Sequence, residues 1–194
     1  TYSTQTGSIE SRATPSQLAR LENDIVPNRG DHIVRVTDAK GNPLAYTINQ
    51  TMMRVDLPQP LSSGAAYVFN VEWWYNINDR MKEGGRSGYE YFPKDSNYLY
   101  AIAQFFPRMC VYDDINGWQH KQFLGSGEFT LVFGDYDVKI TVPSDHAVAA
   151  TGVLQNQKEV LTKTQMDRYA QAQKSYTEPV KIITNEEALK NESS

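Results

Sequence analysis

Acidic and amide side chains cluster at Asp113-Asp114-Ile115-Asn116, where oxygen atoms close together could bind a calcium ion. Neighbouring residues of a strand point to opposite faces of a sheet, so Asp113 and Asp114 would not share a proton as a general acid and base. A plain turn explains the same residues, and the sequence favours the turn over the calcium site.

Three histidines, His32, His120 and His146, supply the nitrogen ligands that a metal could use. A mononuclear zinc site needs three or four ligands, and no two of these histidines have the spacing that places both on one helical face. Cys110 is the single cysteine, which excludes an internal disulfide and a cysteine-rich zinc site. We therefore predict no metal ligand in this chain, surface or supporting histidines, and a free, buried thiol at Cys110.

Two glycine-rich stretches share some features with catalytic motifs. Gly125-Ser126-Gly127 lacks the Gly-x-Ser-x-Gly spacing of a nucleophile elbow, and residues 82–88 are not followed by the Gly-Lys-[Ser/Thr] of a phosphate-binding loop. We predict a turn for the first stretch, a hairpin loop for the second, and no catalytic residue in either.

Gln104 is the polar residue whose surrounding sequence says most about a possible functional site. It lies on a predicted strand, residues 98–106, whose two faces are both apolar or aromatic. An amide in such a place needs hydrogen-bond partners. Two interpretations remain open from the residues alone: Gln104 pairs with neighbouring backbone, or it is presented at a cleft.

These residues depend on a framework of short strands. Residues 67–77 alternate between apolar and polar side chains, which predicts a long central strand with one buried face. Shorter alternations predict strands at 51–57, 129–133, 138–142 and, more weakly, 147–154. The predicted buried faces consist of Tyr67, Phe69, Val71, Trp73, Tyr75 and Ile77 on the long strand, and of Phe129, Leu131 and Phe133 on a later one.

Turn and capping signals divide the chain further. Lys40-Gly41-Asn42-Pro43 predicts a hairpin between strands at 33–36 and 44–48. Helix starts are predicted by three pairs of residues. These are Thr14-Pro15 with Gln17, Asn156 with Glu159 for a helix reaching Ala172, and Thr184 with Glu187 for a short one.

The pattern as a whole predicts a mainly β fold: an antiparallel β-sandwich or saddle-like sheet with a few short peripheral helices. We divide the chain into an N-terminal segment with a short helix at 1–31, a β core at 32–156, and a helical insertion or linker at 157–194.

The composition is that of a globular protein, since the 194 residues are 40% hydrophobic and 22% charged. No apolar run approaches the roughly 20 residues that a membrane span needs. The net charge of −4 argues against a nucleic-acid partner. The chain starts at Thr1 without a leader pattern, so we expect a trimmed or processed chain.

Long ordered motifs surround Gln104 and continue beyond it. They are Ala103-Gln104-Phe105-Phe106-Pro107-Arg108-Met109, Val111-Tyr112-Asp113-Asp114, Gly117-Trp118, Gly127-Glu128-Phe129, Phe133-Gly134-Asp135-Tyr136-Asp137-Val138 and Ile140-Thr141-Val142-Pro143. With Thr51-Met52-Met53-Arg54-Val55 and Gly85-Arg86-Ser87-Gly88-Tyr89-Glu90, this series resembles the N-terminal domain of M1-family zinc metallopeptidases, the aminopeptidase N and leukotriene A4 hydrolase group. The resemblance covers residues 32–156 and is greatest to a bacterial branch common in Bacteroidetes.

The resemblance implies the β-saddle domain of a multidomain enzyme whose catalytic domain binds zinc through a His-Glu-x-x-His helix. This chain contains neither that motif nor the family's Gly-x-Met-Glu-Asn strand. The implied role is therefore non-catalytic: the chain alone is inactive, covers the catalytic domain of the same polypeptide, and leaves zinc to that domain. A periplasmic or secreted location is compatible with the resemblance, and the sequence does not fix it.

The resemblance also implies a role for Gln104. The family has a Thr-Gln pair whose glutamine reaches the amino terminus of the peptide substrate, and Ala103-Gln104 corresponds to that pair. Gln104 would then shape the S1 side of the cleft. The family's Phe-Pro-Cys run is altered here, because Arg108 and Met109 separate Phe106-Pro107 from Cys110.

A free-standing β-sandwich module that binds glycans or peptides is the alternative function. Exposed Trp73, Trp74 or Trp118 could stack on sugar rings, although aromatic residues of a sandwich more often belong to its core. A His-Glu-x-x-His motif further along the reading frame would distinguish the two functions.

Overall fold

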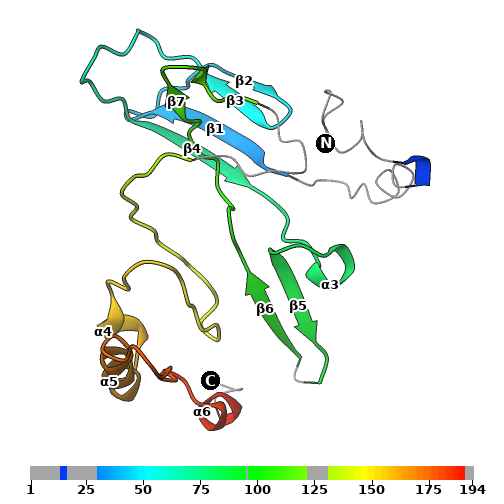
Figure 1. The fold of residues 1–194 in the computed structure, drawn as a ribbon, viewed down its shortest axis with the longest axis vertical. Helices are drawn as coiled ribbons and strands as arrows, with labels where there is room; N and C mark the ends of the chain where they lie inside the picture. Colours follow the sequence, from blue (N-terminus) through cyan, green and yellow to red (C-terminus); the bar gives the residue numbers. More distant parts are fainter. Residues whose placement is uncertain (1–13, 17–29, 95, 122–130, 191–194) are drawn as a thin grey trace. The chain divides into compact units, whose positions relative to one another are not determined.

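The computed structural model describes residues 14–16, 30–94, 96–121 and 131–190. The chain divides into two units, 1–134 and 135–194, and each is described by itself. The first unit is built mainly from strands, and the second carries three helices among its described residues (Figure 1). In chain order the elements are β1 (His32–Asp38), β2 (Tyr46–Asn49), β3 (Met52–Val55), β4 (Phe69–Trp74), α3 (Arg80–Glu83), β5 (Gly88–Phe92), β6 (Asn97–Ala101), β7 (Tyr112–Asp113), β8 (Gly117–Trp118), α4 (Gln157–Val160), α5 (Lys163–Ala172) and α6 (Asn185–Lys190).

The described strands form four antiparallel sheets of two strands each: β1 with β4, β2 with β3, β5 with β6, and β7 with β8. The predicted mainly β fold with antiparallel pairing and a few short helices is therefore confirmed at this level. The sheets are small and unclosed, and the described residues form neither a sandwich nor a saddle.

The predicted central strand forms as β4 and is shorter than residues 67–77. Phe69, Val71 and Trp73 share one face and alternate with three exposed residues, as the period of two requires. We predicted a buried face, but this face is half-buried: among the described strands, β4 pairs only with β1. Within the described residues, the buried hydrophobic side chains are Val36 of β1 and Leu44.

The predicted turn after β1 forms, but it does not join two paired strands. The Asp38 carboxylate accepts hydrogen bonds from the backbone N–H groups of Lys40 (2.8 Å) and Asn42 (2.9 Å). An isolated bridge between Thr37 and Pro43 follows, with backbone hydrogen bonds from the Asp38 N–H to the Asn42 oxygen (2.9 Å) and from the Leu44 N–H to the Val36 oxygen (3.0 Å), and no strand ladder continues from there. The hairpin predicted between 33–36 and 44–48 is therefore formed only next to its turn, and its paired strands are wrong: β2 pairs with β3, and β1 pairs with β4.

The segment predicted as a loop at 82–88 begins inside a helical turn. Asp79 caps α3, since its carboxylate accepts a hydrogen bond from the backbone N–H of Met81 (3.1 Å). An ion pair between Arg80 and Glu90 (3.0 Å) connects α3 to β5. The loop itself is limited to residues 84–87, which precede β5.

The later strands predicted at 129–133, 138–142 and 147–154 are not formed in the described part of the chain. Phe129 lies outside the described residues. Phe133 is fully exposed, which corrects its prediction as a buried residue, and Leu131 is half-buried. An alternating pattern shows that a segment can form a strand, but a strand exists only where another backbone pairs with it.

Local capping signals account for the helices. Pro15 and Ser16 are helical as predicted, and the rest of that helix lies outside the described residues. The Thr184 hydroxyl accepts a hydrogen bond from the Glu187 N–H (3.3 Å), and the Glu187 carboxylate accepts one from the Thr184 N–H (2.9 Å), so the predicted start of α6 is confirmed.

The single helix predicted up to Ala172 is instead two helices, α4 and α5. Leu161 adopts extended backbone between them, and Thr162 begins α5 with a capping box to Gln165 that we did not predict from the sequence. A second strong start signal inside the predicted helix therefore divides it.

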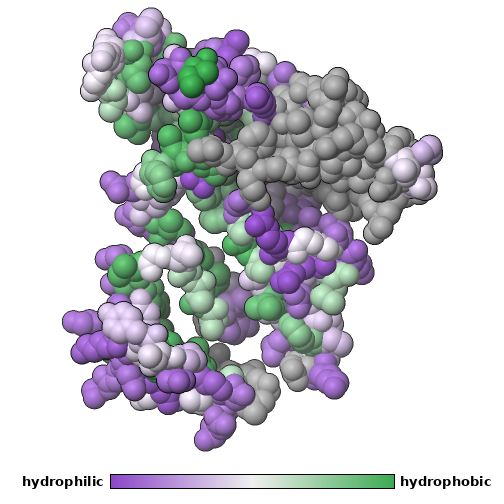
Figure 2. All heavy atoms as spheres, in the orientation of Figure 1, coloured by the Kyte–Doolittle hydropathy of each residue, from purple (hydrophilic) through white to green (hydrophobic). Residues whose placement is uncertain are grey.

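Many large apolar side chains in the described parts of the chain are exposed, and Figure 2 shows hydrophobic residues among hydrophilic ones on the face it displays. No helix found among the described residues is both long and apolar enough to cross a membrane.

Candidate functional site

Gln104 lies just beyond β6, which ends at Ala101 and not at residue 106 as we predicted. Its backbone is left-handed, with φ at +52°, and the residue is exposed. This conformation costs a residue with a Cβ atom about 1 kcal/mol. Such strain persists where the neighbouring structure holds the backbone in place.

Two side chains hold the residues on either side of Gln104. The Ser87 hydroxyl accepts a hydrogen bond from the Ala103 N–H (3.1 Å) and donates one to the Ala103 carbonyl oxygen (3.2 Å). The Trp73 indole N–H donates to the carbonyl oxygen of Phe105 (3.4 Å). The peptide group before Gln104 is thus held by Ser87, and the peptide group after Phe105 is held by Trp73, while the side chain of Gln104 itself is at the surface.

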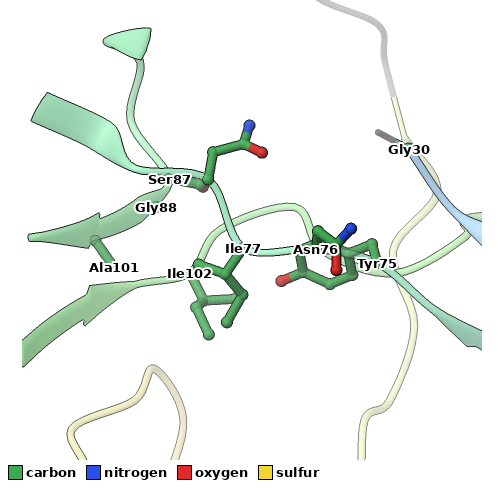
Figure 3. Close-up of a pocket in the computed structure, with 9 residues that line it drawn as sticks. Gly30, Tyr75, Asn76, Ile77, Ser87, Gly88, Ala101 and Ile102 are labelled. Carbon is green, nitrogen blue, oxygen red and sulfur yellow. The ribbon is translucent and has the colours of Figure 1, made fainter. Parts of the chain in front are cut away.

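A pocket of about 280 Å³ opens where the chain leaves β4 and where β5 begins and β6 ends (Figure 3). Its apolar lining comes from Ile77, Ala101 and Ile102, and its polar lining includes Tyr75 and two asparagines, Asn76 and Asn78. Ile77 and Ile102 extend in the same direction in Figure 3. The volume is near the lower limit for small-ligand pockets, about 300 Å³.

The pocket and the Gln104 segment share structural residues. Ser87 lines the pocket and also holds Ala103. Ile102 lines the pocket two residues before Gln104, which places their Cα atoms within about 7 Å of each other. Gln104 itself is not among the residues that line the pocket.

Gly88 is required where the pocket meets the hairpin. Its φ is +145°, and a Cβ atom there would lie 2.6 Å from the Asn78 carbonyl oxygen and 2.9 Å from the Arg80 Cβ. The same Asn78 oxygen accepts a hydrogen bond from the Tyr89 N–H (2.8 Å). Glycine thus allows two segments to approach closely at this edge of the pocket.

The titratable groups next to the pocket are Asp31 and Tyr75. Partial burial raises the pKa of the Asp31 carboxyl, and the charge of His32 opposes that rise. Burial, followed by the negative charge of Asp31, raises the pKa of Tyr75. Both effects shift these groups toward their uncharged forms. The exposed Gln104 amide oxygen can accept a hydrogen bond from a cation.

The acidic cluster at 113–116 forms a turn, as the sequence favoured. The Asp113 carboxylate accepts hydrogen bonds from the backbone N–H groups of Ile115 (3.0 Å) and Asn116 (2.6 Å), and from the Gln119 amide (2.6 Å). These hydrogen bonds, that of the Asn116 N–H first, lower the pKa of Asp113. The Asp113 carboxylate thus stabilises the turn of the β7–β8 hairpin through these hydrogen bonds.

The three histidines lie in different surroundings. His32 stacks on Trp74 with ring centroids 4.1 Å apart, the His120 Nδ1 is 2.6 Å from the Trp118 carbonyl oxygen, and His146 pairs with Asp145. No group of three or more histidine, cysteine, aspartate or glutamate side chains that could hold a metal exists among the described residues.

Cys110 is a free thiol, as predicted, but it is half-buried where we predicted a buried one, and its sulfur lies 3.8 Å from the Met52 sulfur. The tryptophans named as possible sugar platforms divide between two situations. Trp73 is half-buried behind the Gln104 segment, while Trp74 and Trp118 are about half-exposed and pack on His32 and Tyr112.

Gln104 was named as a candidate site residue from the sequence, but the side chains that hold its neighbours, Ser87 and Trp73, were not. Ser87 belongs to a glycine-rich segment that we interpreted only as a connection, and Trp73 was assigned to a strand face. The one signal in the sequence that could have indicated the role of Ser87 is its position among glycines, in Gly85-Arg86-Ser87-Gly88. A serine hydroxyl in such a segment can bond to backbone groups that have no strand partner.

Comparisons with protein-family models, curated proteins and solved structures found nothing that matches this chain. A functional assignment therefore depends on the geometry of the Gln104 segment and on the resemblance of its sequence motifs.

Proposed function

We propose that this chain is the non-catalytic N-terminal β domain of an M1-family zinc aminopeptidase, in which Gln104 binds the free amino terminus of a peptide substrate. The supporting observation is the geometry at Gln104: an exposed amide on left-handed backbone, with the carbonyl groups of the residues on either side, Ala103 and Phe105, held by Ser87 and Trp73. Of the two interpretations left open by the sequence, this geometry favours presentation at a cleft.

The chemistry of the amide suits this role. A protonated amino terminus carries N–H donors and a positive charge, and the Gln104 carboxamide oxygen accepts a hydrogen bond without bringing a charge of its own. The fixed neighbours reduce the conformational entropy that the site would lose on binding. The adjacent pocket would take the uncharged side chain of the first substrate residue, which is the S1 side of the proposed cleft.

The described residues do not fit a zinc site, since they lack a suitable ligand group and the chain lacks His-Glu-x-x-His. In the proposal, zinc and the hydrolytic step belong to a catalytic domain of the same polypeptide, and this chain alone is inactive. The small sheets would then be parts of a saddle-like or sandwich domain that covers the catalytic domain.

The test uses the complete reading frame and two substitutions, Gln104→Ala and Gln104→Gly. Loss of a hydrogen bond to a charged group costs about 1–3 kcal/mol, so we expect kcat/KM for aminoacyl anilides to fall by roughly 5-fold to 150-fold in both variants. Because glycine relieves the left-handed backbone, Gln104→Gly should be at least as stable to heat as the parent protein.

Gln50 provides the matched control, because it is also an exposed glutamine with positive φ (+54°) and lies in the β2–β3 turn. Gln50→Ala should leave kcat/KM unchanged. If Gln104 is instead a structural residue, its variants will lose thermal stability while the folded fraction keeps full specific activity, and the proposal fails. It also fails if the complete protein has no aminopeptidase activity.

A further inference from the structure

Four tyrosines share one face of the β5–β6 hairpin. Tyr89 lies opposite Tyr100, and Tyr91 lies opposite Tyr98, so the two cross-strand pairs follow each other on that face of the ladder. Ring centroids are 4.7 Å apart for Tyr91 and Tyr98 and 6.0 Å apart for Tyr98 and Tyr100. We call these four residues the tyrosine face.

The tyrosine face is open to solvent. Tyr91, Tyr98 and Tyr100 are 45%, 52% and 41% exposed, and Tyr89 is half-buried. Aromatic surface is costly to expose to water, and clustered exposure of this kind marks a binding surface. From the roughly 200 Å² that a whole tyrosine side chain can bury, the four rings offer about 300 Å².

The area decides between a protein partner and a small ligand. A stable protein interface buries about 800 Å² on each partner, so the tyrosine face supplies less than half of what a second copy or another protein needs. A surface of about 300 Å² is instead sufficient for one or two sugar rings.

The charged side chains of the hairpin limit the class of ligand that the tyrosine face can bind. The alternation of β5 places Glu90 on the opposite face, where it pairs with Arg80 (3.0 Å). The tyrosine face thus contains no charged side chain of either strand, which does not suit a phosphate, a sulfated sugar or a nucleic-acid backbone.

We infer that the tyrosine face binds neutral oligosaccharides by stacking pyranose rings on the tyrosine rings. The C–H groups on one face of a pyranose are attracted to the negative face of an aromatic ring, and phenol rings combine apolar area with a polar edge. Proline-rich peptides are taken up in aromatic-lined grooves, whereas these tyrosines lie on one face of a two-stranded ribbon, and none of them lines the pocket beside Gln104. This site is separate from Gln104 and does not depend on the proposed peptidase function.

The experiment titrates the whole chain with cellohexaose, maltohexaose and chitohexaose by isothermal calorimetry. We expect at least one of them to bind, and Tyr98→Ala to weaken that binding by about 5-fold to 10-fold, because the ring at the centre of the face is lost. Tyr98→Phe keeps the ring and should retain the affinity within about 3-fold.

Leu99→Ala is the matched control, because Leu99 is equally exposed (51%) on the next position of the same strand and faces the other side. It should leave binding unchanged, and circular dichroism should show that all three variants are folded. Absence of binding to every hexasaccharide at millimolar concentration overturns the inference. So does tyrosine-dependent binding of a proline-rich peptide without sugar binding, or a dimer that Tyr98→Ala disrupts.

Discussion

Gly88→Ala tests the close approach that forms one edge of the pocket. The added methyl group would lie 2.6 Å from the Asn78 carbonyl oxygen and 2.9 Å from the Arg80 Cβ, and neither atom moves easily. The Asn78 oxygen is bonded to the Tyr89 N–H, and Arg80 begins α3. The backbone at φ +145° costs about 1–3 kcal/mol for alanine, and the steric overlap adds about 1–3 kcal/mol.

The expected destabilisation is therefore about 2–6 kcal/mol, or a fall in Tm of roughly 4–24 °C for a chain of this size. Thermal unfolding followed by circular dichroism measures it. Gly85→Ala is the control, because Gly85 also has positive φ (+95°) but a methyl group added there would meet no heavy atom within 4 Å, so only the backbone cost applies. Equal Tm values for the two variants would refute the close approach at Gly88.

Two further predictions concern carboxylates with lowered pKa values. The hydrogen bond from Arg168 lowers the pKa of Glu187 from 4.5 to about 2. The Arg168–Glu187 pair therefore stabilises the unit of residues 135–194 above pH 4.5, and that stability is lost as the pH falls toward 2. Glu187→Gln should lower Tm at pH 7 and flatten its dependence on pH over this window, measured by circular dichroism; an unchanged pH profile would contradict the pairing. Asp113→Ala should speed amide hydrogen exchange at Ile115 and Asn116, whose N–H groups lose their acceptor, and calcium should not restore protection.

What the sequence could predict was local. The alternation around β4 placed Phe69, Val71 and Trp73 on one face correctly, and the Thr184–Glu187 pair located the start of α6, because both signals act over a few residues. The sequence could not predict which strands pair with each other, because the alternation of apolar and polar residues in a strand is the same whichever strand lies beside it. The strand pairing predicted between 33–36 and 44–48 failed for this reason, since β1 pairs with β4 and β2 pairs with β3.

The candidate site shows the same division. Gln104 could be singled out from the sequence because an amide stood among apolar and aromatic residues. Its left-handed backbone could not be predicted, because its neighbours Ala103 and Phe105 are bonded to Ser87 and Trp73, residues 17 and 31 positions away from Gln104 in the chain. Long-range contacts of this kind are set by tertiary structure and leave no periodic signal.

The β5–β6 hairpin connects the two proposed binding surfaces at one end. Gly88 pairs with Ala101, and the pocket begins there, while Tyr89 and Tyr100 are the next pair along the ladder. A change at Gly88 should therefore disturb both the pocket and the first tyrosine pair. Tyr98 lies further along the hairpin than the Tyr89–Tyr100 pair, and Gln104 lies past the end of β6. The substitutions Tyr98→Ala and Gln104→Gly therefore change different parts of this region. Each of these two substitutions should impair one kind of binding and leave the other intact, so the peptide and sugar hypotheses can fail independently.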